Sequence, residues 1–192
     1  MIMNTNPHYF FAVRLPFQVK ENLNNICENI KVDFPFKSWV HKEDYHITLA
    51  FLGGVPKDKL ALAKENVAAR IQNQSSFPLT IDHLGVFGKK ESPRIFWAGL
   101  EKEKRLDDLR AKVFRSCTEA GFSLETRPFS PHITLARKWM ESRPFSQNDL
   151  NRLDLFKENV VNFLANEVVL YQTHLQQVPK YEAISVYKLM NN

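Results

Sequence analysis

The tetrapeptide His-Ile-Thr-Leu occurs twice in this chain of 192 residues, beginning at His46 and again at His132. Alternate residues of an extended strand point to the same face, so each copy places a histidine and a threonine on one face and two aliphatic residues on the other. Two such strands brought face to face would line a cleft with two imidazoles and the hydroxyls of Thr48 and Thr134. The repeat therefore predicts a reactive site assembled from two similar halves.

The residues around the two copies follow the same order twice. In each half, an apolar run typical of a strand, at 8–15 and at 94–100, precedes a helical pattern, a short connection and the His-x-Thr strand. These repeat halves span about 8–54 and 94–138, and the remaining segments are interleaved between two lobes. We predict one bilobal domain over 1–192 with an α+β fold, in which two mostly antiparallel sheets flank a central cleft and the helices lie outside.

Further elements lie outside the repeat. Their patterning predicts a helix at 56–72, a short helix at 147–156 and strands at 79–87, 167–174 and 181–189. Trp39 and Val40 fall in the connection that leads to the first His-x-Thr strand. The chain contains no low-complexity tract, and no long linker separates the halves.

The composition, 44% hydrophobic and 24% charged, is that of a globular chain able to bury a core. A formal net charge of +5 favours polyanionic partners. The sequence offers no apolar stretch of membrane-spanning length, and residues 1–7 lack the features of a signal peptide, so we expect a cytoplasmic protein without membrane contact. Cys27 and Cys117 each lie in a helical pattern and predict buried free thiols. We expect a monomer.

A pair of histidines on opposite sides of one reacting centre suits acid–base catalysis. A histidine titrates near neutral pH, so one imidazole can remove a proton while the other donates one to a leaving group. Threonine hydroxyls can donate hydrogen bonds to oxygens that gather negative charge in the transition state. This arrangement fits in-line displacement at phosphorus, which needs an acid and a base on opposite sides of the phosphate.

Metal binding and nucleophilic catalysis fit the sequence less well. The six histidines show no His-Glu-x-x-His or His-x-His spacing and no Cys/His cluster, so we expect no metal and no cofactor. Ser130 lies two residues before His132, but no Gly-x-Ser-x-Gly motif surrounds it. The sequence also has no Gly-rich phosphate-binding loop that would indicate use of ATP.

The longer stretches HITLAFLG from His46 and RPFSPHITLAR from Arg127 resemble the 2H phosphoesterase superfamily. Within it they are most similar to the RNA 2′,3′-cyclic phosphodiesterase (2′-5′ RNA ligase) family. FFAVRLP from Phe10 resembles the first strand of that family, and VLYQTHL and KYEAISVYKL resemble its last two strands. The chain departs from the family in carrying Thr173 where a serine is common and Gln-Gln-Val-Pro at 176–179 where a loop glycine is common.

The resemblance implies an enzyme, a phosphoric diester hydrolase that opens a terminal 2′,3′-cyclic phosphate of RNA or nucleotides to a 2′-phosphomonoester without metal. It also implies a weak, ATP-independent reverse reaction that forms 2′-5′ linkages. By the same resemblance His46 is the proton donor and His132 the proton acceptor, with Thr48 and Thr134 completing the catalytic set. Arg137 matches a family arginine that binds substrate phosphate. In a regular strand its odd offset from His132 points it to the wrong face, so the resemblance requires a bulge.

Two alternatives remain open at this point. The first is a cyclic phosphodiesterase of the same superfamily that acts on small nucleotides or on ADP-ribose cyclic phosphate. The second is a non-catalytic RNA-binding module that keeps the fold. The presence of both histidines and both threonines disfavours the module, because a binding protein does not need two imidazoles in acid–base register.

Overall fold

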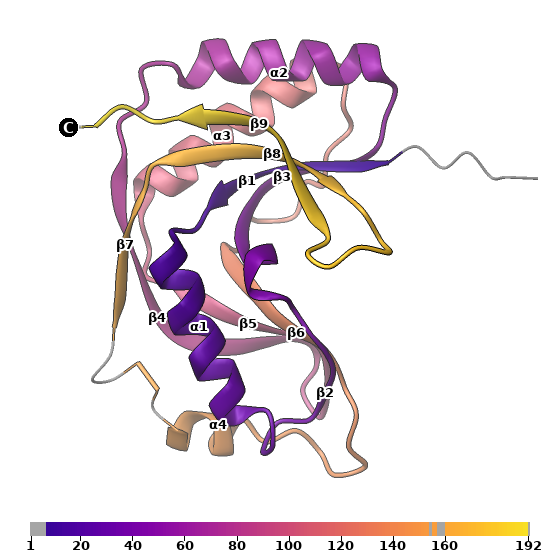
Figure 1. Ribbon diagram of the computed structural model, residues 1–192, viewed down its shortest axis with the longest axis vertical. Helices are drawn as coiled ribbons and strands as arrows, with labels where there is room; N and C mark the ends of the chain where they lie inside the picture. The colour runs from indigo at the N-terminus through magenta and orange to yellow at the C-terminus, as the bar shows by residue number, and fades with distance from the viewer. Residues whose placement is uncertain (1–6, 154, 157–159, 192) are drawn as a thin grey trace, which may run out of the picture.

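The computed structural model describes residues 7–153, 155–156 and 160–191 (Figure 1). Its helices are α1 (Phe17–Ile30), α2 (Lys57–Ile71), α3 (Lys104–Glu119) and α4 (Gln147–Leu153), with a 3-10 helix η1 (Lys42–Asp44). Its strands are β1 (His8–Arg14), β2 (Phe36–Trp39), β3 (His46–Gly54), β4 (Phe77–Lys89), β5 (Ser92–Leu100), β6 (His132–Trp139), β7 (Val161–Ala165), β8 (Glu167–Thr173) and β9 (Tyr181–Lys188). Residues 1–6, on which the expectation for the N-terminal segment rests, lie outside the described residues.

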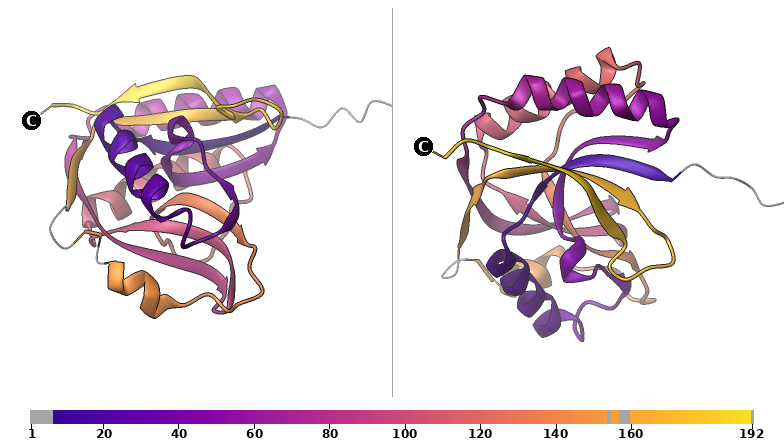
Figure 2. Two further views of the ribbon diagram at one scale, coloured as in Figure 1. Left: turned by 60° about the horizontal axis from the view of Figure 1, so that its bottom comes forward. Right: turned by 45° about the horizontal axis from the view of Figure 1, so that its top comes forward.

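The described strands form two sheets in which every pairing is antiparallel. Sheet A has the order β3-β1-β8-β9, and sheet B has the order β2-β6-β5-β4-β7. Figure 2 shows the two sheets as separate layers, with helices on their outer sides. The predicted α+β class with two antiparallel sheets is therefore confirmed. No helix in the described part of the chain is long and apolar enough to cross a bilayer.

The first helix of each half lies against the sheet of the other half. α1 follows β1 of sheet A but contacts β7 of sheet B, and α3 follows β5 of sheet B but packs against β3 and α2 on sheet A (Figure 1). Each connection therefore crosses from one sheet to the other. Each His-x-Thr strand pairs with the first strand of its own half, β3 with β1 and β6 with β5, and β3 and β6 also contact each other.

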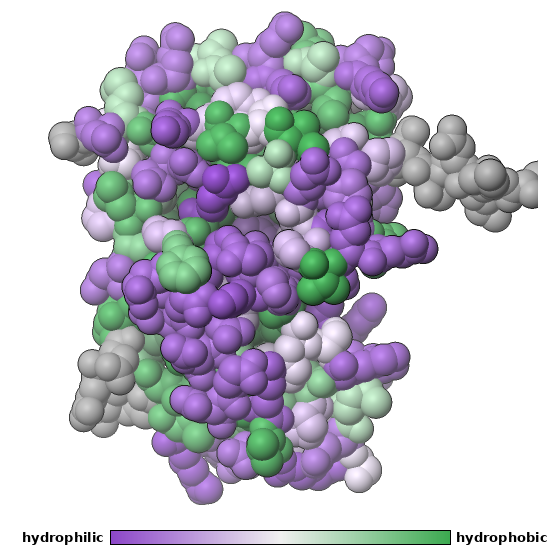
Figure 3. All heavy atoms as spheres, in the orientation of Figure 1, coloured by the Kyte–Doolittle hydropathy of each residue, from purple (hydrophilic) through white to green (hydrophobic). Residues whose placement is uncertain are grey.

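The predicted apolar stripes of these helices face the core. The buried stripes consist of Val19, Leu23, Cys27 and Ile30 in α1 and Leu106, Leu109, Val113 and Cys117 in α3. A fully buried leucine contributes about 2 kcal/mol of apolar transfer free energy, so these stripes account for the docking of both helices. Both cysteines are free and buried, as predicted. The outer side of α1 is polar, and polar residues dominate that part of the surface in Figure 3.

Three elements differ from the sequence predictions. The segment that contains Trp39 was predicted as a connection, but it forms β2, which pairs with the far end of β6. The strand β7 was not predicted, and it pairs with β4 at the edge of sheet B. Both strands are short, and their pairing depends on partners far away in the sequence. The predicted helix at 147–156 ends at Leu153, and Asp154 lies outside the described residues.

Candidate active site

The two His-x-Thr strands expose the side chains that the sequence predicted. On β3 the side chains of His46 and Thr48 are half-buried, whereas Ile47 between them is fully buried in the core. On β6 His132 and Thr134 are half-buried in the same way. We call the sheet face that carries these residues the inner face of each sheet. The strands β3 and β6 contact each other, and His132 lies within electrostatic reach of His46.

A bulge occurs at the same position of both strands. Along β3 the pairing with β1 skips Leu49, and along β6 the pairing with β5 skips Leu135. In both strands the skipped leucine and the alanine after it are buried side by side. A bulge reverses the alternation of the residues that follow, so Arg137 returns to the face that carries His132. The bulge that the family resemblance required for Arg137 is therefore present.

Both histidines are held by the same hydrogen bond. His46 Nδ1 lies 2.7 Å from the main-chain carbonyl of Asp44, and His132 Nδ1 lies 2.8 Å from that of Ser130. A carbonyl can only accept, so Nδ1 carries the proton in both rings and the neutral Nε2 is an acceptor. On the His46 side this acceptor is already engaged, because Nε2 lies 3.1 Å from Thr48 Oγ1 and accepts its hydroxyl proton.

The free site favours neutral imidazoles. The pKa of His46 is lowered to about 4, first by burial and then by the positive charges of His132 and Arg137. Burial also lowers the pKa of His132, and Arg137 again contributes. Arg137 therefore lies within electrostatic reach of both histidines, although its own side chain is exposed. The site is positively charged around two uncharged acceptors, which favours an anionic ligand.

Aromatic side chains surround each imidazole. On sheet A the ring centroid of His46 lies 4.7 Å from that of Phe10 and 5.2 Å from that of Tyr181, with Tyr171 at 6.1 Å. On sheet B the ring of Phe87 lies edge-on to His132 at 4.9 Å. These rings explain why burial dominates the pKa shifts of both histidines.

The sequence did not single out these aromatic neighbours. Two other aromatic residues, Tyr9 and Trp139, are buried in the core. Phe51 is exposed near the end of β3. The alternation of β1 and β8 predicts a face for Phe10 and one for Tyr171, but only the pairing of β1 with both β3 and β8 puts these faces beside His46.

Asp44 joins the His46 site to the hairpin between β8 and β9. Its buried carboxylate accepts the main-chain N–H of Lys180 at 2.9 and 3.0 Å and that of Tyr181 at 3.1 Å. Its own carbonyl orients His46. One residue therefore fixes the catalytic ring and the strand whose tyrosine packs on that ring. No signal in the sequence pointed to this role.

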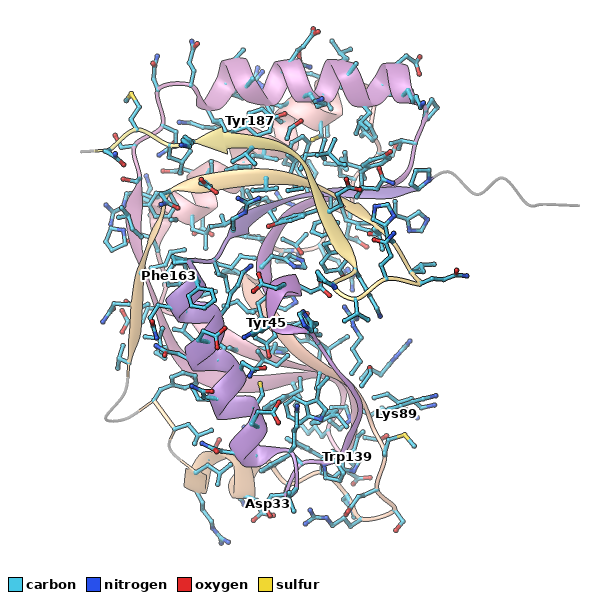
Figure 4. The ribbon with its side chains drawn as sticks, in the orientation of Figure 1. Asp33, Tyr45, Lys89, Trp139, Phe163 and Tyr187 are labelled. Carbon is cyan, nitrogen blue, oxygen red and sulfur yellow. The ribbon has the colours of Figure 1, made fainter. Side chains whose placement is uncertain are left out.

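A buried tyrosine supports the same segment from the core side. Tyr45 lies between Asp44 and His46 and points toward α1, where Figure 4 labels it beside η1. Its hydroxyl donates to Cys27 Sγ at 3.5 Å. The residue before the catalytic strand is thereby tied to the helix that crosses to sheet B.

The alternative chemistries find little support in the geometry. Ser130 contacts His132 through its main-chain carbonyl rather than its hydroxyl. Burial raises the pKa of Cys27 to about 11 and that of Cys117 to about 12, so both remain protonated thiols at neutral pH. Within the described residues, no group of three or more His, Cys, Asp or Glu side chains is placed to hold a metal ion.

Comparison with known proteins shows similarity over nearly the whole of this chain. The chain is 43% identical over 183 residues to the RNA 2′,3′-cyclic phosphodiesterase of Geobacillus stearothermophilus, which covers 95% of this chain and 57% of that relative. It thus spans little more than half the length of that relative. It is 34% identical over 183 residues to the RNA 2′,3′-cyclic phosphodiesterase of Bacillus subtilis, covering 95% of this chain and 97% of the relative.

A solved structure shares the fold. The crystal structure of Escherichia coli LigT complexed with 3′-AMP has a TM-score of 0.76 at 24% sequence identity and covers 96% of this chain and 99% of that chain. The family model described as LigT like Phosphoesterase matches residues 13–97 and 99–181, so that one match contains His46 and the other contains His132. The chain belongs to the LigT-like 2H phosphoesterase family, as its two His-x-Thr strands predicted.

Proposed function

We propose that this protein hydrolyses the terminal 2′,3′-cyclic phosphate of RNA to a 2′-phosphomonoester. One observation carries the proposal. Two imidazoles from different sheets are both held through Nδ1 by the carbonyl two residues earlier, and Arg137 lies within reach of both. The relatives named RNA 2′,3′-cyclic phosphodiesterase support the choice of substrate.

In the proposed mechanism His132 is the proton acceptor and His46 the proton donor, as the family motif implies. His132 Nε2 takes a proton from water, and the water oxygen attacks phosphorus in line with the bond to the ribose 3′-oxygen. That P–O bond breaks, and His46 Nε2 gives its proton to the 3′-oxygen. Thr48, Thr134 and Arg137 stabilise the charge on the non-bridging oxygens. No step requires a metal or a cofactor.

Substrate binding favours uptake from solvent of the proton that this mechanism needs. In the free site the lowered pKa values leave both imidazoles neutral at pH 7. A phosphodiester bound between them brings a negative charge that favours one imidazolium, and so raises the pKa of the pair. The pair then holds one proton, which is the state that acid–base catalysis requires. The hydrogen bond from Thr48 to His46 must be exchanged for one to the phosphate in this step.

The same chemistry with a different nucleophile joins two RNA ends. If the 5′-hydroxyl of a second strand replaces water, the product is a 2′-5′ phosphodiester, and no ATP is required because the cyclic phosphate supplies the energy. We therefore include 2′-5′ ligation and its reversal, 2′-5′ cleavage, in the proposal. We also infer a monomeric, cytoplasmic protein. The buried free thiols agree with a reducing compartment, and size-exclusion chromatography with light scattering tests the oligomeric state.

The direct test uses purified protein and defined substrates. We expect an oligonucleotide ending in a 2′,3′-cyclic phosphate to be converted to a 2′-phosphate end, with undiminished rate in EDTA. Products are assigned by mass and by resistance to a 3′-specific phosphatase. A 3′-phosphate product would overturn the assigned bond cleavage. A rate that disappears on chelation and returns with a divalent ion would overturn the metal-free mechanism.

A further inference from the structure

Three ring side chains cover the inner face of sheet B beside His132. The ring centroid of Trp97 lies 5.5 Å from that of His83, 4.9 Å from that of Phe87 and 6.2 Å from that of His132. We call His83, Phe87 and Trp97 the ring floor. Each of the three keeps accessible surface, and half of the His83 side chain is exposed. The mechanism of hydrolysis assigns no task to them.

Two glycines allow these rings to lie across the sheet. A Cβ added at Gly85 would lie 2.4 Å from ring atoms of Trp97, and one added at Gly99 would lie 2.2 Å from ring atoms of His83. Real Cβ contacts are not this short, so any other residue at either position would displace the ring. The rings therefore rest directly on the backbone of the neighbouring strand, and this contact leaves their other side for a ligand.

Strand register places the ring floor next to the reacting groups. His83, Gly99 and His132 are direct cross-strand partners, and so are Trp97 and Thr134. Neighbouring strands are about 4.8 Å apart, so the His83 ring over Gly99 is one strand spacing from His132. A ligand that exchanges a proton with His132 can therefore stack another of its groups on the ring floor.

The His83 ring has a fixed orientation. Its Nδ1 lies 2.5 Å from the Asp82 carboxylate, which accepts the Nδ1 proton. The opposite ring edge, with Nε2, lies over Gly99, which is the strand partner of His132. This pair keeps the ring in place although its side chain is half exposed.

We propose that the ring floor binds the nucleoside whose 5′-hydroxyl is the nucleophile in ligation and the leaving group in 2′-5′ cleavage. This inference rests on the proposed function, because it uses His132 as the base. In-line geometry puts the ribose 3′-oxygen, and the nucleoside that bears it, on the His46 side. The entering 5′-oxygen must then lie on the His132 side, beside the ring floor. Flat rings with one free side fit a nucleobase, which stacks on aromatic side chains regardless of its identity.

The step is balanced without a further reactant. In ligation the P–O5′ bond forms, the P–O3′ bond breaks, the 5′-hydroxyl proton goes to His132 and the His46 proton goes to the 3′-oxygen. In 2′-5′ cleavage each transfer is reversed. Water has no base to stack, so the ring floor assists transfer to and from a nucleoside but not hydrolysis. The floor therefore sets the ratio of the two reactions.

The test compares two diesters with similar leaving groups. One is 2′-5′ linked diadenosine monophosphate, and the other is adenosine 2′-(methyl phosphate), which lacks only the leaving nucleoside. We expect wild-type kcat/KM to be roughly tenfold or more higher for the dinucleotide. His83→Ala and Trp97→Leu should each reduce this preference several-fold, and Trp97→Phe should retain most of it. Phe17→Ala, which removes an exposed ring from α1, is the matched control and should change nothing.

The outcomes separate this proposal from the proposed function. Hydrolysis of adenosine 2′,3′-cyclic phosphate is measured on every preparation, and its absence in the wild type would overturn the proposed function itself. Hydrolysis without cleavage of either diester would overturn the ring-floor proposal alone. The ring-floor proposal would also be overturned if the wild type did not prefer the dinucleotide. It would be overturned as well if both His83→Ala and Trp97→Leu kept the wild-type preference. Because the preference is a ratio within one preparation, partial unfolding of a variant does not alter it.

Discussion

The two half-sites hold their histidines in the same way but surround them differently. Each histidine donates Nδ1–H to the carbonyl two residues before it, and each strand bulges at the leucine three residues after it. Around His46, however, Asp44 ties down the β8–β9 hairpin and Thr48 occupies Nε2. No such carboxylate stands at the other position, where Ser130 is exposed.

This difference shows which features of the site are determined by the repeated tetrapeptide and which are not. The orientation of each ring depends on local geometry that the repeated tetrapeptide carries with it. Phe10 and Trp97 come from the first strand of each repeat half, but the other rings beside the histidines, Tyr171, Tyr181 and Phe87, come from elements that the repeat does not contain, β8 and β9 on sheet A and β4 on sheet B. We infer that the shared part performs proton transfer and that the unshared parts distinguish the two sides of the phosphate.

The largest expected effect comes from removing either imidazole. His46→Ala and His132→Ala should each lower kcat by roughly 10²–10⁴-fold without unfolding the protein, and the double variant should be little worse than either. A substrate in which sulfur replaces the 3′-bridging oxygen distinguishes the roles of the two histidines, because a thiolate leaves without a proton. That substrate should restore turnover to His46→Ala but not to His132→Ala. Rescue of His132→Ala alone would reverse the assigned roles, and equal rescue of both variants would overturn the assignment of distinct roles.

The two threonines should differ in how they respond to the same substitution. Thr48→Val and Thr134→Val each delete a donor to the phosphate and should cost about 1–3 kcal/mol of transition-state stabilisation. Thr48 also donates to His46 in the free site, so Thr48→Val should alter the pKa of His46 as well, measured by NMR titration. Thermal midpoints should hardly change. Full turnover in both variants would remove the threonines from the mechanism.

The sequence predicted the chemistry of the site better than its surroundings. The faces of His46 and Thr48 follow from strand alternation alone, which is local. The inward position of Arg137 does not, because it depends on the bulge at Leu135, and the family resemblance rather than the pattern pointed to it. Asp44 reaches a loop 136 residues away, a contact that no local pattern contains.

The sequence pattern also did not predict that the first helix of each half packs against the sheet of the other half. Apolar stripes predicted that α1 and α3 are helices with a buried face, but a stripe does not specify which sheet it packs against. The single bilobal domain over 1–192 remains a prediction. Because each half contributes a helix to the other sheet, it would appear as one cooperative unfolding transition by two probes.

A substitution at Asp44 tests whether the two half-sites are supported differently, and its expected effect on stability is moderate. Asp44→Asn keeps the main-chain carbonyl that orients His46 but weakens the hydrogen bonds to Lys180 and Tyr181, at a cost of about 1–3 kcal/mol. Hydrogen exchange of these two amides should accelerate. Ser130→Ala, the equivalent change in the other half, should leave both stability and turnover unchanged. Similar effects of the two substitutions would mean that the half-sites are supported alike.

The smallest expected effect concerns the dependence of stability on pH. His46 titrates near 4 in the folded protein and near 6.5 when unfolded, so the unfolded chain binds more protons between these values. Stability should therefore fall as the pH drops below about 6.5, by about 1 kcal/mol at pH 5 after allowance for solvent screening at this half-buried ring. His46→Gln abolishes this contribution, and its unfolding free energy, measured in urea at pH 5 and pH 7, should change less than that of the wild type. His132→Gln should have a weaker effect, because the hydrogen bond that holds His132 is exposed whereas that of His46 is partly buried. If His132→Gln flattened the profile more, His132 rather than His46 would be the more strongly desolvated of the two imidazoles.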